Sequence, residues 1–132
     1  ELTETDTQDV TDAVGAFLAL DSAARLNAGP YVFQNYQSIV DAVGEGQVEC
    51  QVSNPEAIWA HVHPTLIRVC RRSRGDHFIY IVIDAECDWE PEHGLQIVYR
   101  RGNELCRVSD QSDGDLTYAD VYDLPEDQDK IV

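Results

Sequence analysis

The chain has 132 residues, of which 43% are hydrophobic, so it is long enough for one domain with a single core. Its 25 acidic and 9 basic residues give a formal net charge of -16 at pH 7. This charge disfavours nucleic acid and anionic membrane surfaces as partners and suits a basic protein, although a need for solubility also explains it. The sequence contains neither a membrane-spanning apolar stretch nor a signal-peptide pattern, so we expect a cytoplasmic protein.

The first third of the chain has helical periodicity. Apolar residues recur at the spacing of one helix face at Val10, Ala13, Val14, Phe17 and Leu18. The pattern can continue to Leu26 before Asn27 to Gly29 interrupts it. A second helix is expected to begin near Pro30, since proline suits a first helical turn, and to end at Gly44.

The next segment, before the sheet, is less regular. Residues 48–52 fit either a short edge strand or an extended linker. Asn54-Pro55-Glu56 is typical of a helix start, so we expect a short helix over residues 57–62 that ends at His63-Pro64.

From Thr65 the hydrophobic period changes to two, which is typical of strands. Strands are predicted over 66–71, 77–89, 95–100 and 104–109, and the short turns between them require antiparallel pairing. The predicted fold is therefore α+β, with N-terminal helices packed on a four-stranded antiparallel meander sheet. We expect a single domain over residues 1–132, with 1–64 mainly helical, 65–109 forming the sheet, and 110–132 forming an acidic C-terminal segment. Thr117-Tyr118 and Val121-Tyr122 are expected to dock on the sheet, while the final residues are expected to be solvated and mobile.

An acidic run at the end of the longest predicted strand is the strongest functional signal. Side chains alternate between the two faces of a strand, so residues 79 to 89 give one apolar row that ends in Cys87 and Trp89. The other row turns acidic halfway and continues into the following turn. The candidate binding residues of this acidic face are Asp84, Glu86, Asp88, Trp89, Glu90, Glu92 and His93.

The octapeptide from Cys87 to Gly94, together with Trp59 and the segment Val108 to Thr117, resembles a bacterial domain family of unknown function marked by a CDWE-x-EHG hairpin. The resemblance covers roughly the C-terminal half. It implies an α+β domain in the bacterial cytosol, and because small acidic families of this kind often lie in toxin and immunity neighbourhoods, it also implies an immunity-like role. The family provides no catalytic residues to transfer to this chain.

Three interpretations of the acidic run remain open. In the first, Glu90, Glu92 and His93 bind a divalent cation. In the second, the run is structural, and its carboxylates pair with arginines across the sheet, namely Arg68, Arg71, Arg72, Arg74, Arg100, Arg101 and Arg107. In the third, the acidic face captures a basic protein, with Trp89 or Tyr99 as an anchor.

Other chemistry has weaker signals. Four widely spaced cysteines (Cys50, Cys70, Cys87 and Cys106) lack zinc-ribbon spacing and are interpreted as small apolar residues. His61 and His63 form a metal-like pair without a third ligand, and the segment 110–115 fails the calcium-loop pattern. No motif requires a cofactor, and no nucleophile with a base can be named. We therefore expect a protein that acts by binding rather than as an enzyme.

Overall fold

The computed structural model describes residues 3–112 and 114–132. Helices α1 (Glu4–Leu18) and α2 (Ser22–Val43) are followed by the short 3-10 helices η1 (Glu45–Gln47) and η2 (Pro55–His61). Four strands then follow, β1 (Val62–Arg71), β2 (Ile79–Cys87), β3 (Leu95–Arg100) and β4 (Glu104–Ser109), and the chain ends with α3 (Tyr118–Tyr122) and η3 (Glu126–Gln128). The strands pair in the order β1-β2-β3-β4, and every pair is antiparallel. The predicted α+β fold, with helices preceding a meander sheet, is confirmed.

The boundary between the first two helices lies earlier than the sequence predicted. Asp21 caps α2 by accepting a hydrogen bond from the backbone N–H of Ala23 (2.9 Å), and the helix continues through residues 27–29 and through Pro30. Gly29 is buried where α2 packs on η2, and a β-carbon there would lie 3.4 Å from Trp59 Nε1. The residues that were expected to interrupt the helix therefore include the one through which α2 packs against η2.

The segment between α2 and the sheet matches the prediction only in part. Residues 48–52 form a linker, which is one of the two forms that the sequence allowed, and Tyr36 Oη accepts a hydrogen bond from the backbone N–H of Val52 (3.1 Å). Asn54 caps η2 as predicted, but the helix is a 3-10 helix. His63 and Pro64, expected to lie before the sheet, already pair with β2, so β1 begins four residues earlier than predicted. The bounds of β3 and β4 are confirmed, whereas β2 is shorter than the predicted 77–89.

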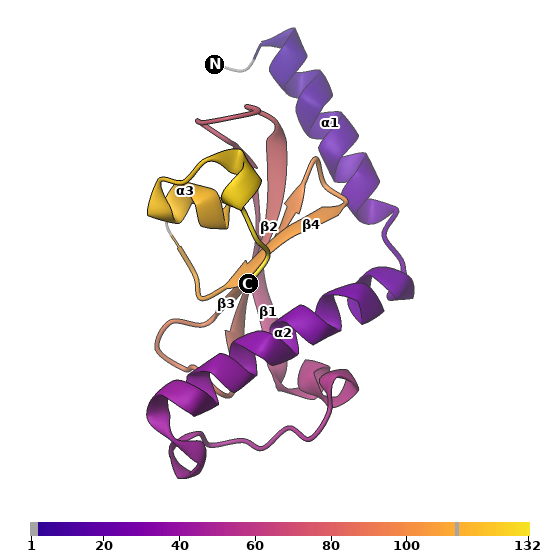
Figure 1. The fold of residues 1–132 in the computed structure, drawn as a ribbon. Helices are drawn as coiled ribbons and strands as arrows, with labels where there is room; N and C mark the ends of the chain where they lie inside the picture. Colours follow the sequence, from indigo (N-terminus) through magenta and orange to yellow (C-terminus); the bar gives the residue numbers. More distant parts are fainter. Residues whose placement is uncertain (1–2, 113) are drawn as a thin grey trace.

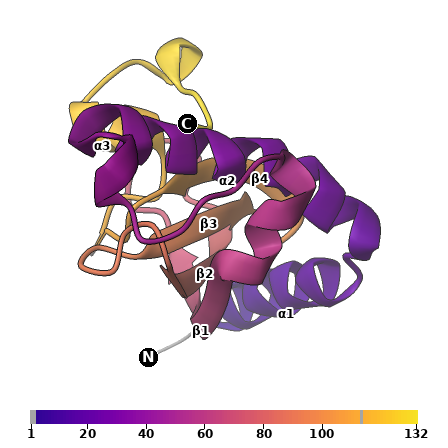
Figure 2. The ribbon, with the colours of Figure 1, turned by 90° about the horizontal axis from the view of Figure 1, so that it is seen from below.

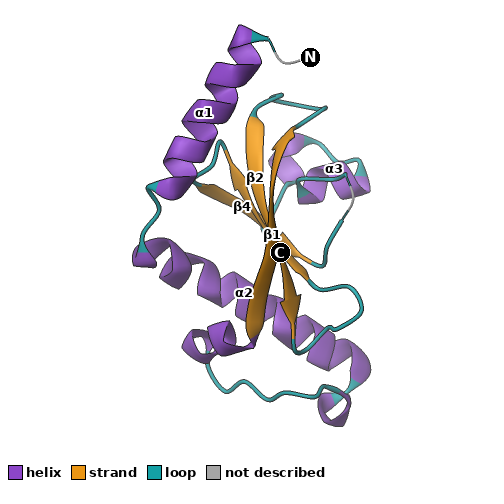
Figure 3. Cartoon of the chain, turned by 180° about the vertical axis from the view of Figure 1, so that it is seen from behind, coloured by secondary structure: helices purple, strands orange, loops and turns teal. Residues whose placement is uncertain are grey.

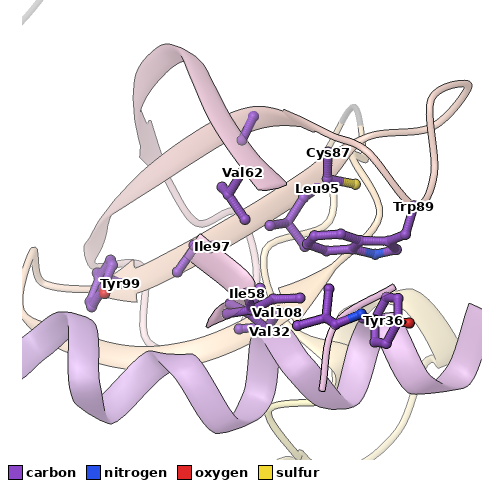
Figure 4. Close-up of a cluster of buried hydrophobic side chains, with 12 residues drawn as sticks. Val32, Tyr36, Ile58, Val62, Cys87, Trp89, Leu95, Ile97, Tyr99 and Val108 are labelled. Atoms are coloured by element: carbon purple, nitrogen blue, oxygen red, sulfur yellow. Dashed lines mark hydrogen bonds between the residues drawn. The ribbon is translucent and has the colours of Figure 1, made fainter. Parts of the chain in front are cut away.

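The two faces of the sheet have separate apolar contacts. In Figures 1 and 3, α1 and α3 lie on opposite sides of one end of the twisted sheet, and α2 crosses its other end. One face packs beneath α2 through a cluster that includes Val32, Ile58, Leu95 and Val108 (Figures 2 and 4). The other face buries Tyr80, Val82, Val98, Cys106 and Leu116. This second cluster brings the start of the C-terminal segment against the sheet.

The C-terminal segment is ordered against the sheet rather than solvated along its length. Leu116, Thr117 and Ala119 are buried, whereas the predicted docking residues Val121 and Tyr122 are exposed. Near the chain end, the carbonyl of Ile131 accepts a hydrogen bond from the N–H of Val108 in β4 (2.8 Å). Buried contacts of this segment therefore lie before α3 and within it, and its last residues, Ile131 and Val132, pack against the core cluster beneath α2 instead of being solvated as expected.

Candidate functional site

The predicted acidic run forms the end of β2 and the loop to β3, here called the acidic hairpin (residues 84–94). The loop is held closed by backbone hydrogen bonds from Gly94 N to Glu90 O (3.0 Å) and from Gln111 N to His93 O (3.1 Å). Gly94 has φ 64°, and a β-carbon there would lie 2.7 Å from the carbonyl oxygen of Ala85. Only glycine fits this turn without displacement of its neighbours, so the loop has a defined shape.

Asp84, the first acidic residue, is buried and paired with a neighbouring strand. Its carboxylate accepts hydrogen bonds from Arg68 Nε (2.7 Å) and Arg68 Nη2 (3.1 Å). Arg68 also donates to the side chain of Gln96 on β3 (3.3 Å). Cross-strand pairing by arginine, one of the three interpretations of the run, is thus found at this position, and Asp84 is not exposed for a partner.

Asp88 is hydrogen bonded to both His61 and His63, the pair for which the sequence showed no third metal ligand. One carboxylate oxygen lies 2.9 Å from His61 Nδ1, and the other lies 2.9 Å from His63 Nε2. These hydrogen bonds, first from His61 and then from His63, hold the pKa of Asp88 below its usual value. Pairing of His63 with Glu86 across the two strands brings the groups together. Had β1 been predicted to begin at Val62, the proximity of His63 to Asp88 would have followed from the sequence, because alternate residues of a strand share one face.

The remaining acidic residues of the hairpin are more exposed. Glu86 and Glu92 are exposed, and the described part of the chain shows no ion pair to either. The Glu90 side chain is 20% exposed and lies 3.4 Å from Nδ1 of His93, whose own side chain is 62% exposed. The outer surface of the hairpin therefore carries two unpaired carboxylates, together with the partly exposed Asp88 and Glu90.

Trp89 belongs to the core and not to the exposed surface. It is only 3% exposed, packs edge-on to Tyr36 with ring centroids 5.9 Å apart, and donates from Nε1 to Asn35 Oδ1 (2.9 Å; Figure 4). Tyr99, the other suggested anchor, is 6% exposed. The expectation that either aromatic ring contacts a partner is therefore wrong for this conformation. Their burial fixes the base of the hairpin instead.

Most of the arginines near the strands pair with other parts of the chain. Arg72, only 2% exposed, is the centre of a charged cluster on the face beneath α3, here called the Arg72 cluster. Its guanidinium donates to Asp120 (2.7 and 3.0 Å), to Glu126 and to Asp76 (3.3 Å), and it also contacts Tyr80 Oη (3.4 Å). The sequence offered no signal for these pairings, since Asp120 and Glu126 lie about fifty residues away.

The Arg72 cluster shifts the titration of the groups around it. Burial alone would raise the pKa of Asp120, but the hydrogen bonds and charge of Arg72, with smaller contributions from Thr117 and Arg74, together hold that pKa below its usual value. Burial would also raise the pKa of Asp76, but hydrogen bonds from Tyr80 and from the backbone of Phe78, together with the charges of Arg100 and Arg72, hold it below its usual value. Burial raises the pKa of Tyr80. The cluster joins the C-terminal segment to the sheet through groups that are charged at neutral pH.

Metal and thiol chemistry have little support in the structure. Over residues 3–112 and 114–132, no three His, Cys, Asp or Glu side chains come together as a metal ion requires, and this includes the suggested set Glu90, Glu92 and His93. In the calcium-like segment 110–115, Asp113 lies outside the described residues. All four cysteines are free; Cys87 and Cys106 are buried, and burial raises their pKa values to about 11 and about 12. The prediction that cysteines pack as small apolar residues holds for these two.

A second acidic surface lies at the opposite end of β2. An open groove of about 530 Å³ between α1 and the β3–β4 turn is lined by Asp9, Asp12 and Glu104 together with Phe78 and Arg101. Asp9 is already paired with Arg71 (3.0 Å), and Arg101 lies over the Phe78 ring. Carboxylates therefore gather at this groove as well as at the acidic hairpin.

These features define an α+β domain with an acidic surface. The chain belongs to the family described as "Domain of unknown function (DUF6985)", whose pattern matches residues 1–116. The match extends well beyond the C-terminal half on which the resemblance rested. Residues 117–132 lie outside the matched range, and they include Asp120 and Glu126 of the Arg72 cluster. No curated protein and no solved structure matches the chain significantly. In the described residues no helix has the length and apolar character needed to cross a membrane.

Proposed function

We propose that the protein is a non-enzymatic binding module that captures a basic protein through the exposed surface of the acidic hairpin, in an immunity-like role in the bacterial cytoplasm. The observation that carries the proposal is the exposure of Glu86 and Glu92, which form no ion pair among the described residues. A net charge of -16 would steer a cationic partner towards such a surface and speed association.

The framework of the hairpin supports this role. Trp89 is anchored in the core, Asp84 is held by Arg68, and Gly94 closes the loop, so the free carboxylates project from a defined backbone. A preorganised surface loses less conformational entropy on binding than a mobile acidic tail does. Binding is favoured over catalysis because Asp84 and Asp88 are already paired, and Glu90 is in contact with His93.

Cation binding by Glu90, Glu92 and His93 is the alternative, and the geometry lends it less support. Nδ1 of His93 lies 3.4 Å from a carboxylate oxygen of Glu90. Glu92 is exposed, and it contacts Glu90 through its backbone N–H and not through its carboxylate. Thermal unfolding with and without calcium, manganese or zinc tests it. A metal at a hundred times its dissociation constant would add about 2.7 kcal/mol to stability, whereas an unchanged melting temperature would remove this alternative.

The main test compares three double variants that change the net charge equally. Glu86→Gln with Glu92→Gln alters the hairpin, Asp12→Asn with Glu104→Gln alters the groove, and Asp41→Asn with Glu49→Gln alters exposed positions elsewhere. The probe is a short Lys-rich peptide, titrated by fluorescence anisotropy at fixed ionic strength. We expect the hairpin variant to weaken binding about tenfold, equivalent to about 1.4 kcal/mol, and the other two variants to weaken it less than about twofold.

Equal losses in all three variants would contradict the proposal, because the peptide would then respond only to bulk charge. The substituted side chains are exposed or line the open groove, so the variants should fold like the parent protein. Circular dichroism before each titration checks this point.

A further inference from the structure

Strand β1 has one open side. It pairs with β2 on the other side and, among the described strands, has no second neighbour. The hydrogen bond from Arg72 N to Phe78 O (3.0 Å) shows which backbone groups are left unpaired, because bonded and outward-facing residues alternate in an antiparallel pair. Counted back from Arg72, the outward-facing residues are Ile67, Val69 and Arg71. Within residues 3–112 and 114–132, no backbone group from outside the sheet bonds to these three residues.

The side chains along this open edge are apolar and exposed. Leu66, Ile67 and Val69 have exposed fractions of 55%, 54% and 44%. Ile67 and Val69 lie opposite Ile83 and Ile81 of β2 and share one face of the sheet, whereas Leu66 lies on the other face. The proline and the irregularity of β1, which could protect the edge, both precede Leu66. An added strand with an apolar middle would therefore find apolar contacts on both faces.

Carboxylates outnumber cationic groups at both ends of the edge. At the end of β1, the guanidinium of Arg71 is shared by Asp6 (2.7 Å) and Asp9 (3.0 Å) on α1, which leaves an excess of negative charge. At the start of β1, His63 lies opposite Glu86, which is exposed and forms no ion pair among the described residues. Basic residues at both ends of an added strand would complement these charges.

We propose that the basic partner contributes an extended strand to the open edge of β1, with apolar residues in its middle and Lys or Arg at each end. This inference rests on the proposed function, from which it takes a basic partner. The middle of β1 is electrically balanced, because Arg68 is bonded to Asp84 (2.7 Å). A second copy of the chain would bring the same excess of carboxylates and fits less well. Strand addition also places the partner beside the acidic hairpin, since Glu86 lies two strand spacings, about 10 Å, from the added strand.

A strand-forming peptide tests the pairing of backbones. The probe is Lys-Lys-Val-Thr-Val-Thr-Val-Lys-Lys, labelled for fluorescence anisotropy and titrated at fixed ionic strength. Its control has the same sequence with all five central amides N-methylated, which keeps every charge and removes the central donors. We expect the control to bind about tenfold or more weakly than the probe. Equal affinities would overturn the inference, because charge alone would then explain binding.

A proline in β1 tests the same pairing from the side of the protein. Val69→Pro removes an outward-facing N–H and no bond to β2, and proline is tolerated where the N–H of an edge strand faces solvent. This variant should bind the probe about tenfold more weakly. The control is Val69→Thr, which keeps the N–H and the branched shape and should change binding less than about twofold. Circular dichroism checks the fold of both variants, and equal binding by both would contradict strand addition.

Hydrogen exchange on the unaltered protein needs no variant. In the free protein, the amides of Ile67, Val69 and Arg71 should exchange faster than those of Arg68 and Cys70, which bond to β2. The probe should slow exchange at the first three amides. No added protection there would overturn the inference. Protection that rises with protein concentration in the absence of the probe would also overturn it, because a second copy would then occupy the edge.

The two proposals fail separately. If Val69→Pro leaves binding of the probe unchanged while Glu86→Gln with Glu92→Gln weakens the Lys-rich peptide, the acidic hairpin binds the partner and strand addition is refuted. If Val69→Pro weakens the probe while the three charge variants affect the Lys-rich peptide equally, the β1 edge binds a basic strand and the hairpin proposal fails.

Discussion

Replacing Arg72 with methionine should destabilise the protein more than any other single charge removal in the sheet. Methionine keeps much of the side-chain volume, so the main loss is the guanidinium, which is only 1% exposed. The change leaves Asp120, 7% exposed, with only Arg74 at 3.9 Å, and it leaves Asp76, 19% exposed, with only Arg100 at 3.2 Å. Removal of one member of a buried ion pair costs about 3 to 5 kcal/mol, since the remaining charge is uncompensated. For a chain of this length, that cost lowers the melting temperature by roughly 10 to 18 °C.

Urea unfolding followed by circular dichroism measures this free energy of unfolding. The matched control is Arg71→Met, which removes an arginine whose side chain is 35% exposed and which pairs with Asp6 and Asp9 on α1. Solvent screens exposed ion pairs, so the control should lose far less stability than Arg72→Met does. Equal losses for Arg71→Met and Arg72→Met would refute the reasoning that burial makes the Arg72 cluster important.

Two further predictions concern stability. Asp76, Asp88 and Asp120 have lowered pKa values when folded, so the stability that they contribute is present above about pH 4 and is lost as the pH falls through their folded pKa values. Urea unfolding between pH 7 and pH 3 should show this decline, and Asp120→Asn should flatten it; an unchanged slope would contradict the assignment. Gly102→Ala should cost about 1 to 3 kcal/mol, because Gly102 has φ 92° and a β-carbon there would clash with the Ala13 carbonyl oxygen. Gly15→Ala, where no atom lies within 4 Å, should be neutral or stabilising in the same assay, and equal costs at both sites would rule out the steric explanation.

The fold was largely predictable because its signals are local. The change of period near Thr65 and the short turns determine the antiparallel meander, and the bounds of β3 and β4 follow directly from alternation. Pro30 was misleading, because a proline at a first turn and a proline inside a packed helix look alike in sequence. Packing of Gly29 against Trp59 accompanies the longer helix, and this contact spans thirty residues.

The candidate site was predicted in part, and the missing part depends on distant contacts. Alternation correctly assigned Cys87 and Trp89 to the core and placed Glu86 on the opposite face. The pairing of Asp88 with His61 and His63 was missed because β1 was expected to begin at Leu66. Arginines were expected to neutralise the hairpin, but among the described residues only Arg68 forms an ion pair with it, through Asp84. Sequence spacing does not show with which distant residue a charged side chain forms an ion pair.

The binding proposal is tested most directly by an NMR titration of the isotope-labelled protein with the Lys-rich peptide. Backbone amide shifts report which residues sense the bound peptide without altering any charge. We expect the largest shifts at residues 86–94, with smaller ones at His61 and His63, because these histidines contact Asp88. Largest shifts around Asp12 and Glu104, or weak shifts of similar size over the whole surface, would contradict the assignment of partner binding to the acidic hairpin.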